Sequence, residues 1–460
     1  MSRRTAEKRP PLKVAFRTLT NRNYMLYWTG QLVSLSGTWM QRVAQAWLVL
    51  KLTNSPLALG TITTVQFVPI MVFSLFGGVF ADRLPRRKLV IATQTVMAIQ
   101  ALIFAVLAST GLIQLWHIYV LAAILGIASA ADMPARQAFL MEIVGPENLS
   151  NAVALNSTQM NVSRILGPAL GGIGIAVFGV AGCFYLNSAS YLAVIAALIF
   201  MNPKLFFEAA PRIHGNVFKQ LFEGLHYALT TADVLFIVIV LAVIGTFGYN
   251  FTVMLPLIAK YVLNSGPAGF GVLTSAMGAG AVVSALGVAY MGNPTRKTVL
   301  IGGAGFSLLL ISLAFARAWA IAIPLTVVLG VFSVAFQATS STRFQLLAPP
   351  AMRGRIMSIY QLLVAGSTPV GSFFFGWMAD HLGVSEATFV MGSLCALGIV
   401  GGLLFIRARS AVLLPDEQSA LEGRRADNRR IAAEAEAATA QAAQAATIAM
   451  NAEVEASGGE

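Results

Sequence analysis

The chain has 460 residues, of which 57% are hydrophobic and only 11% are charged. Soluble domains carry about 25% charged residues, so this composition could not cover soluble domains with a polar surface. The net charge is +12, and the positively charged residues cluster at the ends of apolar runs and in both tails. This distribution is typical of a membrane protein and excludes a basic surface for binding nucleic acid.

Long apolar runs recur along most of the chain. A helix needs about 20 mostly apolar residues to cross about 30 Å of hydrocarbon. Such runs predict an all-α membrane protein with twelve transmembrane helices. The predicted spans are 24–50, 57–81, 89–109, 117–138, 154–178, 182–201, 233–260, 267–291, 298–316, 320–341, 355–379 and 388–407.

The spans fall into two groups of six, separated by a polar gap. The gap is predicted to be a linker with a short amphipathic helix, and the Ala-, Glu- and Arg-rich end of the chain to be a flexible, solvated tail. The expected parts are a cytoplasmic N-terminal tail (1–22), an N-terminal six-helix bundle (23–202), a cytoplasmic linker (203–230), a C-terminal six-helix bundle (231–409) and a cytoplasmic tail (410–460).

Positive charge distinguishes the two sides of the predicted membrane. Of 31 Lys and Arg residues, 26 fall in the tails and in the loops on the same side, whereas Lys51, Lys260 and Arg317 fall in the opposite loops. Because cytoplasmic loops carry the excess of Lys and Arg, both termini are predicted to be cytoplasmic. The basic N-terminal stretch is not followed by a short apolar core with a small-residue cleavage site, so we expect no cleaved signal peptide.

Four short echoes in register relate the two halves. Thr38-Trp39 is echoed by Thr246-Phe247, and Pro168 by Pro369. Asn54-Ser55-Pro56 after the first span is echoed by Asn264-Ser265-Gly266-Pro267 after the seventh, and Arg87-Lys88 by Arg296-Lys297. Paired halves around a site near the midplane of the bilayer are typical of secondary transporters. The repeat therefore predicts two pseudo-symmetric bundles.

The loop after the second predicted span reads GGVFADRLPRRK. It resembles the Major Facilitator Superfamily signature, although Pro85 replaces the usual glycine. The resemblance implies a conformational latch whose acid faces the start of span eleven, near 354–356, where a helix N-terminus favours a carboxylate. The alternative is that the basic residues only satisfy the positive-inside rule. The latch residues would be Gly78, Asp82, Arg83, Arg86, Arg87 and Lys88.

The fifth predicted span contains GPALGG, formed by Gly167, Pro168, Gly171 and Gly172. This resembles the antiporter motif of the superfamily, which is associated with exporters. The alternative is a packing kink that has no bearing on the direction of transport. Arg164 lies one turn before the motif, and an Arg at this depth marks a pathway by default, unless it snorkels to the surface.

Polar residues recur at helical spacing within the first predicted span, from Gln31 to Gln45. They predict one wall of a wet cavity, or alternatively a polar seam against another helix. Two cations in this cavity could hold an anionic or catechol-like group. The candidate cavity residues are Thr38, Gln41, Arg42, Gln45, Asn161, Arg164, Tyr249 and Asn250.

The sequence contains no phosphate-binding loop for ATP, no metal-ligand spacing among its four histidines and no catalytic constellation. We therefore expect a transporter rather than an enzyme, with no cofactor and with the proton gradient as its energy source. Asp132 is the one acid expected to be embedded in a span, and with Arg136 it is the candidate for proton coupling. The alternative is a structural ion pair.

The apolar part as a whole resembles the Major Facilitator Superfamily. The stretches around residues 37–60, 134–157 and 163–172 are similar to its enterobactin-exporter and macrolide-efflux-like branch. The resemblance implies a monomer in the bacterial inner membrane that exports a bulky, amphipathic small molecule in exchange for protons. The alternatives are an importer of a small metabolite and a non-transporting receptor or assembly protein.

Overall fold

The computed structural model describes residues 17–207, 217–290, 294–349 and 352–412. Within these ranges every regular element is a helix, which confirms the all-α prediction. Residues up to Gly402 form one compact unit, and a second unit begins at Leu403. The site lies in the first unit.

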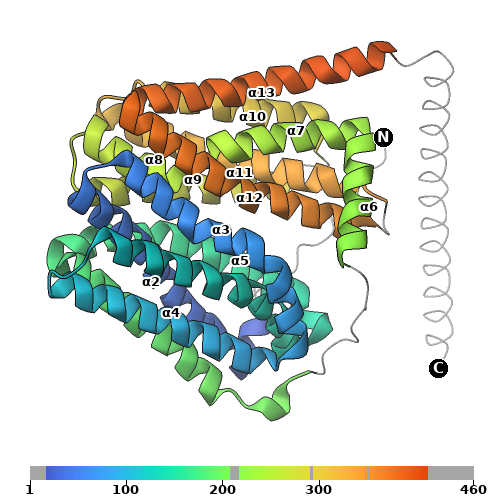
Figure 1. Cartoon of the computed structure of the whole chain (residues 1–460). Coiled ribbons are helices and arrows are strands. Elements are labelled where there is room, and N and C mark those ends of the chain that lie inside the picture. The colour runs from blue at the N-terminus through green and yellow to red at the C-terminus, as the bar shows by residue number, and fades with distance from the viewer. Residues whose placement is uncertain (1–16, 208–216, 291–293, 350–351, 413–460) are drawn as a thin grey trace, which may run out of the picture. The chain divides into compact units, whose positions relative to one another are not determined.

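The first group of helices follows the short helix η1 (Arg17–Thr20) and is seen in blue to green in Figure 1. Three of its helices each cover one predicted span: α2 (Arg22–Thr53), α3 (Pro56–Arg83) and α4 (Arg86–Ser109). The fourth, α5 (Leu115–Phe200), contains three predicted spans and is interrupted twice.

The two interruptions of α5 are glycines in the left-handed region. Gly145 has φ 72° and Gly179 has φ 69°, and these positions separate the predicted spans 117–138, 154–178 and 182–201. Glycine adopts this conformation without the steric cost that a Cβ brings. A Cβ at Gly145 would also stand 2.8 Å from the ring of Phe207, so this break is closely packed.

The second group follows η2 (Pro203–Leu205). Its first membrane-type segment, predicted at 233–260, consists of three pieces with an interruption at Tyr249 and Asn250. The elements of this group are α6 (Val217–Thr230), α7 (Ala232–Gly248), α8 (Phe251–Leu257), the π-helix η3 (Ile258–Val262), α9 (Pro267–Tyr290), α10 (Arg296–Leu313), α11 (Trp319–Leu347), α12 (Arg353–His381) and α13 (Val384–Val412).

Helix α6 is the amphipathic helix expected in the linker. Its Tyr227 hydroxyl donates to the carbonyl oxygen of Leu347 at 2.9 Å, and its Glu223 pairs with Arg355 at the start of α12. These contacts attach α6 to the second group of helices. The nine preceding residues, 208–216, lie outside the described part of the chain.

The outward surface of the helices is apolar. Large side chains such as Ile301, Leu308 and Leu286 are more than 60% exposed, which suits contact with lipid rather than water. Among the described residues, nine helical stretches are long and apolar enough to cross a membrane, with α5 counted once and α2 not included. The number of crossings and the location of each terminus stay predictions.

The internal repeat is visible in the backbone. Asn54 and Asn264 have φ values of 51° and 46°, and within the described ranges no other non-glycine residue has a positive φ. Asparagine tolerates this conformation better than most residues. The two matched Asn-Ser turns therefore follow the first helical segment of each group.

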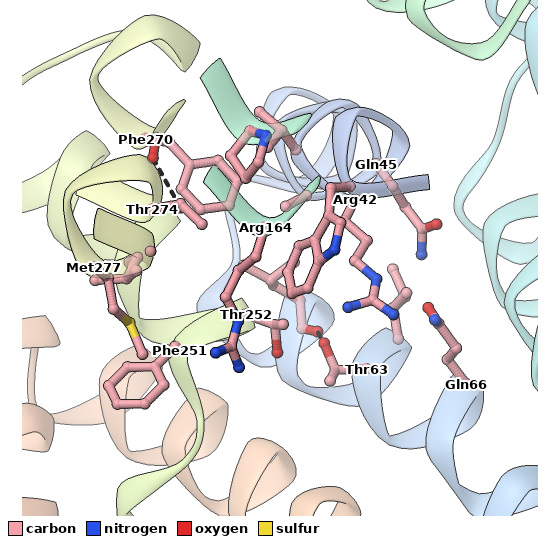
Figure 2. A pocket seen from close by; sticks show the side chains of 18 of the residues that line it. Arg42, Gln45, Thr63, Gln66, Arg164, Phe251, Thr252, Phe270, Thr274 and Met277 are labelled. Atoms are coloured by element: carbon pink, nitrogen blue, oxygen red, sulfur yellow. Dashed lines mark hydrogen bonds between the residues drawn. The ribbon is translucent and has the colours of Figure 1, made fainter. Parts of the chain in front are cut away.

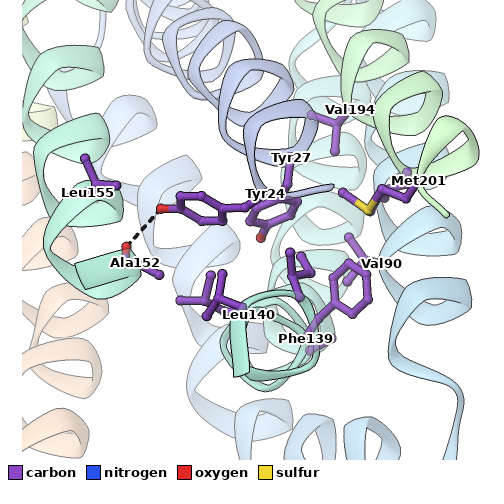
Figure 3. Close-up of a cluster of buried hydrophobic side chains, with 13 residues drawn as sticks. Tyr24, Tyr27, Val90, Phe139, Leu140, Ala152, Leu155, Val194 and Met201 are labelled. Atoms are coloured by element: carbon purple, nitrogen blue, oxygen red, sulfur yellow. Dashed lines mark hydrogen bonds between the residues drawn. The ribbon is translucent and has the colours of Figure 1, made fainter. Parts of the chain in front are cut away.

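The interior of the first group is filled by aromatic and aliphatic side chains, shown in Figure 3. Tyr24 of α2 is fully buried, and its hydroxyl donates to the carbonyl oxygen of Ala152 in α5 at 3.1 Å. Tyr27 meets the edge of Phe139 with ring centroids 6.1 Å apart. This packing holds α2 against α5, and the orientation of α2 decides which of its polar residues face the site.

Small residues bring the two groups of helices together. A Cβ at Gly60 in α3 would overlap the carbonyl oxygen of Ser372 in α12, so glycine permits close approach there. The Thr64 hydroxyl donates to the carbonyl oxygen of Pro369 at 2.7 Å, and the Ser275 hydroxyl of α9 donates to that of Ile165 at 2.8 Å. Helices α3 and α5 therefore contact α12 and α9 directly.

Candidate functional site

A cavity of about 210 Å³ lies where α2, α3 and α5 of the first group meet α8 and α9 of the second. Figure 2 shows side chains that line it. Its wall is mainly apolar, with a few polar groups. The lining residues are Trp39, Arg42, Val43, Gln45, Ala46, Leu59, Ile62, Thr63, Gln66, Phe67, Arg164, Pro168, Tyr249, Phe251, Thr252, Leu255, Phe270, Thr274, Met277 and Gly278.

Two guanidinium groups reach into this cavity, Arg42 from α2 and Arg164 from α5 (Figure 2). Arg42 lies over the Trp39 ring, with Cζ 4.5 Å from the ring centroid. The ion pairs of the described residues involve other arginines, and within the same ranges neither cavity arginine has a hydrogen-bond partner. Both cations are therefore free to meet a ligand.

Other polar side chains of the cavity are also available. The Thr252 hydroxyl is buried without a hydrogen-bond partner in the described structure. Gln45 and Gln66 lie on the Arg42 side of the view in Figure 2. The Tyr249 hydroxyl, in contrast, donates to the carbonyl oxygen of Ser333 at 2.8 Å, so it presents mainly its ring.

Four of the predicted cavity residues are placed elsewhere. Gln41 is buried and bonded to Gln100 and Asn187, and Thr38 meets the Tyr191 hydroxyl at 3.2 Å. The polar stripe of α2 thus divides between the cavity and a seam against α4 and α5. Asn250 is fully buried and accepts from the Ser372 hydroxyl, while the Asn161 amide donates to the Ser157 carbonyl oxygen.

The GPALGG motif lies behind the cavity wall. A Cβ at Gly167 would overlap the Cβ of Trp39, and one at Gly171 would stand 2.9 Å from the Cβ of Val43. A Cβ at Gly172 would come within 3.0 Å of the Cα of Ala268 in α9. The motif therefore lets α5 approach α2 on one side and α9 on the other, with Pro168 in the lining between them.

Asp132 is completely buried between α4 and α5. Its Oδ1 accepts from the Thr93 hydroxyl at 2.7 Å and from the Gln94 amide at 3.0 Å. Its Oδ2 lies 2.7 Å from Nε of Arg136, and Arg136 also donates to Gln31 of α2 at 2.6 Å. The proton-coupling candidates thus form a polar cluster that joins three helices and lies outside the cavity lining.

The described residues of the predicted latch make contacts within the first group. Arg86 pairs with Glu142 at 2.9 Å. Arg87 donates to the carbonyl oxygens of Leu198 and Ile199, and Lys88 is exposed. The side chains of Gly78, Asp82 and Arg83 lie outside the described residues.

At the predicted outer end, charged side chains of the second group cap helix ends of the first. The Lys260 ammonium donates to the Leu50 carbonyl oxygen at 2.7 Å and to Asn54 Oδ1 at 2.8 Å, where α2 ends. The Asp380 carboxylate accepts from the Ser55 hydroxyl at 2.9 Å, where α3 begins. A cation at a helix C-terminus and an anion at an N-terminus are both favourable, so these contacts hold the two groups together.

Sequence reasoning missed several cavity residues. Gln66 is an isolated amide in an otherwise apolar predicted span, which is a usable signal. Thr252 follows the interruption at Tyr249 and Asn250, and its exposure to the cavity depends on that break. Trp39, Phe251 and Phe270 carry no sequence signal that separates a cavity aromatic from a core aromatic.

A mainly apolar cavity that holds two arginines, enclosed by helices of two matched halves in a chain with a lipid-compatible surface, is typical of a membrane transporter of the major facilitator type. The chain belongs to the transmembrane secretion effector family of this superfamily, whose sequence profile matches residues 13–438. The family predicted from the GGVFADRLPRRK and GPALGG motifs is confirmed.

Relatives of known name match this chain over most of its length. The staphyloferrin A transporter of Staphylococcus aureus (strain NCTC 8325 / PS 47) is 24% identical over 77% of this chain and 89% of its own length. Macrolide efflux protein A of Streptococcus pyogenes is 22% identical over 80% and 92%, and the enterobactin exporter EntS of Escherichia coli O157:H7 is 24% identical over 81% and 89%.

Solved structures support the fold. The nucleoside transporter NupG superimposes with a TM-score of 0.66 at 11% identity, covering 84% of this chain and 98% of that one. A bacterial homologue of the human lysosomal transporter Spinster superimposes with a TM-score of 0.63 at 14% identity, covering 86% and 96%. These likenesses show that the chain has the helical fold of these proteins.

Proposed function

We propose that the protein exports a bulky, amphipathic small molecule, siderophore-like or drug-like, in exchange for protons. The observation that carries the proposal is that Arg42 and Arg164 both face one cavity between the two groups of helices. The efflux-type relatives support the outward direction.

Transport would proceed by alternating access. Substrate would enter from the cytoplasm and bind at Arg42 and Arg164. The helix-end contacts of Lys260 and Asp380 would then break as the outer ends separate. Glycine-mediated contacts between α5 and α9 and between α3 and α12 would serve as the surfaces about which the halves rock.

Protons would bind at the Asp132 cluster. The Asp132 carboxylate pairs with Arg136 and accepts hydrogen bonds from Thr93 and Gln94. A rearrangement of α2 would disturb this cluster, because Gln31 of α2 accepts a hydrogen bond from Arg136. The cluster would thereby couple the proton gradient to movement of the helix that carries Arg42.

Inverted membrane vesicles test the proposal. We expect vesicles containing the protein to accumulate labelled enterobactin or erythromycin when the vesicle interior is acidified, and a protonophore to abolish accumulation. Arg42→Gln should lower the rate by about tenfold or more, because it removes a charged group that contacts substrate. Arg317→Gln, an exposed arginine outside the cavity, is the matched control.

The competing functions give different results in the same assay. An importer would accumulate solute in right-side-out vesicles and not in inverted ones. A receptor or assembly protein would show no protein-dependent flux in either orientation. Proton-independent accumulation in inverted vesicles would retain export and reject the coupling.

A further inference from the structure

The cavity offers far more hydrogen-bond donors than acceptors. Each guanidinium carries five N–H donors and no acceptor, and both Arg42 and Arg164 are unpaired within the described part of the chain. Gln45 and Gln66 each add an amide with two N–H donors and one acceptor oxygen, and the Thr252 hydroxyl is without a partner in the same part. An excess of free donors is complementary to a ligand rich in oxygen acceptors.

The cavity also lacks a counter-ion of its own. No Asp or Glu is among its described lining residues, and the buried carboxylate of Asp132 is engaged by Arg136 outside the lining. Two cations in one cavity of low polarity repel each other, and a nearby anion lowers their electrostatic energy. A positively charged ligand would add a third like charge.

The arrangement of Arg42 leaves it able to bind. Its guanidinium lies over Trp39, 4.5 Å from the ring centroid, and stacking of this kind holds the group while the N–H groups at its edge stay free. Oxygen anions such as carboxylates accept two parallel N–H bonds from such an edge. The Trp39 side chain thus presents Arg42 to a ligand.

The remaining wall suits an apolar, flat ligand part. Phe67, Phe251 and Phe270 line the cavity with Trp39 and Met277. Figure 2 shows Phe251, Phe270 and Met277 on the side of the cavity facing Arg164. Aromatic side chains of this kind stack against rings and bury them.

From these observations we infer that the cavity selects an amphipathic oxygen anion, with carboxylate or phenolate groups at Arg42 and Arg164 and an aromatic or apolar part against the ring-lined wall, and that it rejects an amphipathic cation. This inference rests on the proposed function, since it names the substrate class of the same cavity. Of the two compound types proposed there, an acidic siderophore-like molecule fits, and a drug with a basic amine does not.

Binding of two dyes that share one ring system tests the inference. Fluorescein is an anion and rhodamine 123 is a cation built on the same xanthene skeleton. Fluorescence anisotropy of each is titrated with the purified full-length protein in an uncharged maltoside detergent. We expect saturable binding of fluorescein and binding of rhodamine 123 that is weaker by about tenfold or more, which is the factor that 1.4 kcal/mol represents.

Three variants assign the effect to the two cavity arginines. Arg42→Gln and Arg164→Gln should each weaken fluorescein binding by about tenfold or more, because each removes a charged donor. Arg42→Lys keeps the charge, guards against misfolding and should retain part of the affinity. Arg317→Gln, outside the cavity, should bind as the unchanged protein does.

The possible outcomes separate this inference from the proposed function. Equal or tighter binding of rhodamine 123, or fluorescein binding unaffected by both Gln substitutions, overturns the anion preference whatever the vesicles show. Anion binding without proton-dependent flux retains the inference and rejects the export function. Displacement of fluorescein by lysophosphatidylglycerol but not by free citrate would identify the anion as a lipid, and the reverse as a soluble compound.

Discussion

The Asp132–Arg136 pair allows a quantitative prediction. Asp132 is 0% exposed and Arg136 is 25% exposed, with Nε and Oδ2 2.7 Å apart. Breaking a buried pair by removing one partner costs about 3–5 kcal/mol, because the other charge is left uncompensated. We expect Asp132→Asn to lower the free energy of unfolding by about 3 kcal/mol, since the guanidinium that remains is partly solvated. Arg136→Gln should lie near the upper figure, since the carboxylate that remains is shielded from water.

The double variant distinguishes the pair from two independent residues. If the charges stabilise each other, Asp132→Asn with Arg136→Gln should cost less than the sum of the single changes by about 2 kcal/mol or more. The Thr93 hydroxyl and the Gln94 amide can still donate to the amide oxygen that Asp132→Asn introduces, which limits the loss further.

The two natural cysteines supply the assay. Cys183 and Cys395 are free and fully buried, so a thiol-reactive dye reports unfolding during titration with SDS in mixed micelles. Lys88→Gln, at an exposed position, should change the free energy of unfolding by less than about 0.5 kcal/mol. If each single variant loses only a few tenths of a kcal/mol, as an ordinary surface change does, or if the losses are strictly additive, the reasoning is refuted.

Two further predictions concern contacts between the groups of helices. Gly271→Val should lower the free energy of unfolding by about 1–3 kcal/mol and slow transport, because its Cβ would stand 2.7 Å from a carbonyl oxygen of α5. Gly287→Val, with no atom within 4 Å of its Cβ, should have neither effect. Equal losses in unfolding assays would contradict this prediction. Lys260→Met and Asp380→Asn should each raise, several-fold, the rate of amide hydrogen exchange at the end of α2 and the start of α3. Lys51→Met, at an exposed position at the same end, should leave the rate unchanged. Unchanged exchange in the first two variants would show that these contacts do not stabilise the helix ends.

Much of the fold was predictable because it follows from local hydropathy. The predicted spans fall on observed helical segments, and the Asn54 and Asn264 turns appear in both halves as the repeat predicted. The three spans inside α5 were separable in sequence, and in the structure Gly145 and Gly179 leave helical geometry between them.

The cavity was predictable only in part. Arg42 and Arg164 were found because a charge in an apolar span is costly and conspicuous. The neighbouring Gln41 and Thr38 were equally conspicuous, but they bond to Gln100 and Tyr191 within the first group. Periodicity places Thr38, Gln41 and Arg42 on one broad face of α2, and it cannot say which part of that face another helix covers.

The sequence by itself determined that the helices are surrounded by lipid, where they lie along the chain, which family the chain belongs to and that charged residues are embedded. Each of these depends on residue types and their spacing along the chain. The Asp132–Arg136 pair is a contact between residues four apart in α5, which the sequence already offered as an alternative. Only the tertiary structure decided that Arg42 and Arg164 share one cavity with no acidic residue in its described lining, because that lining comes from helices distant in sequence, whose approach depends on how glycines and aromatic rings pack.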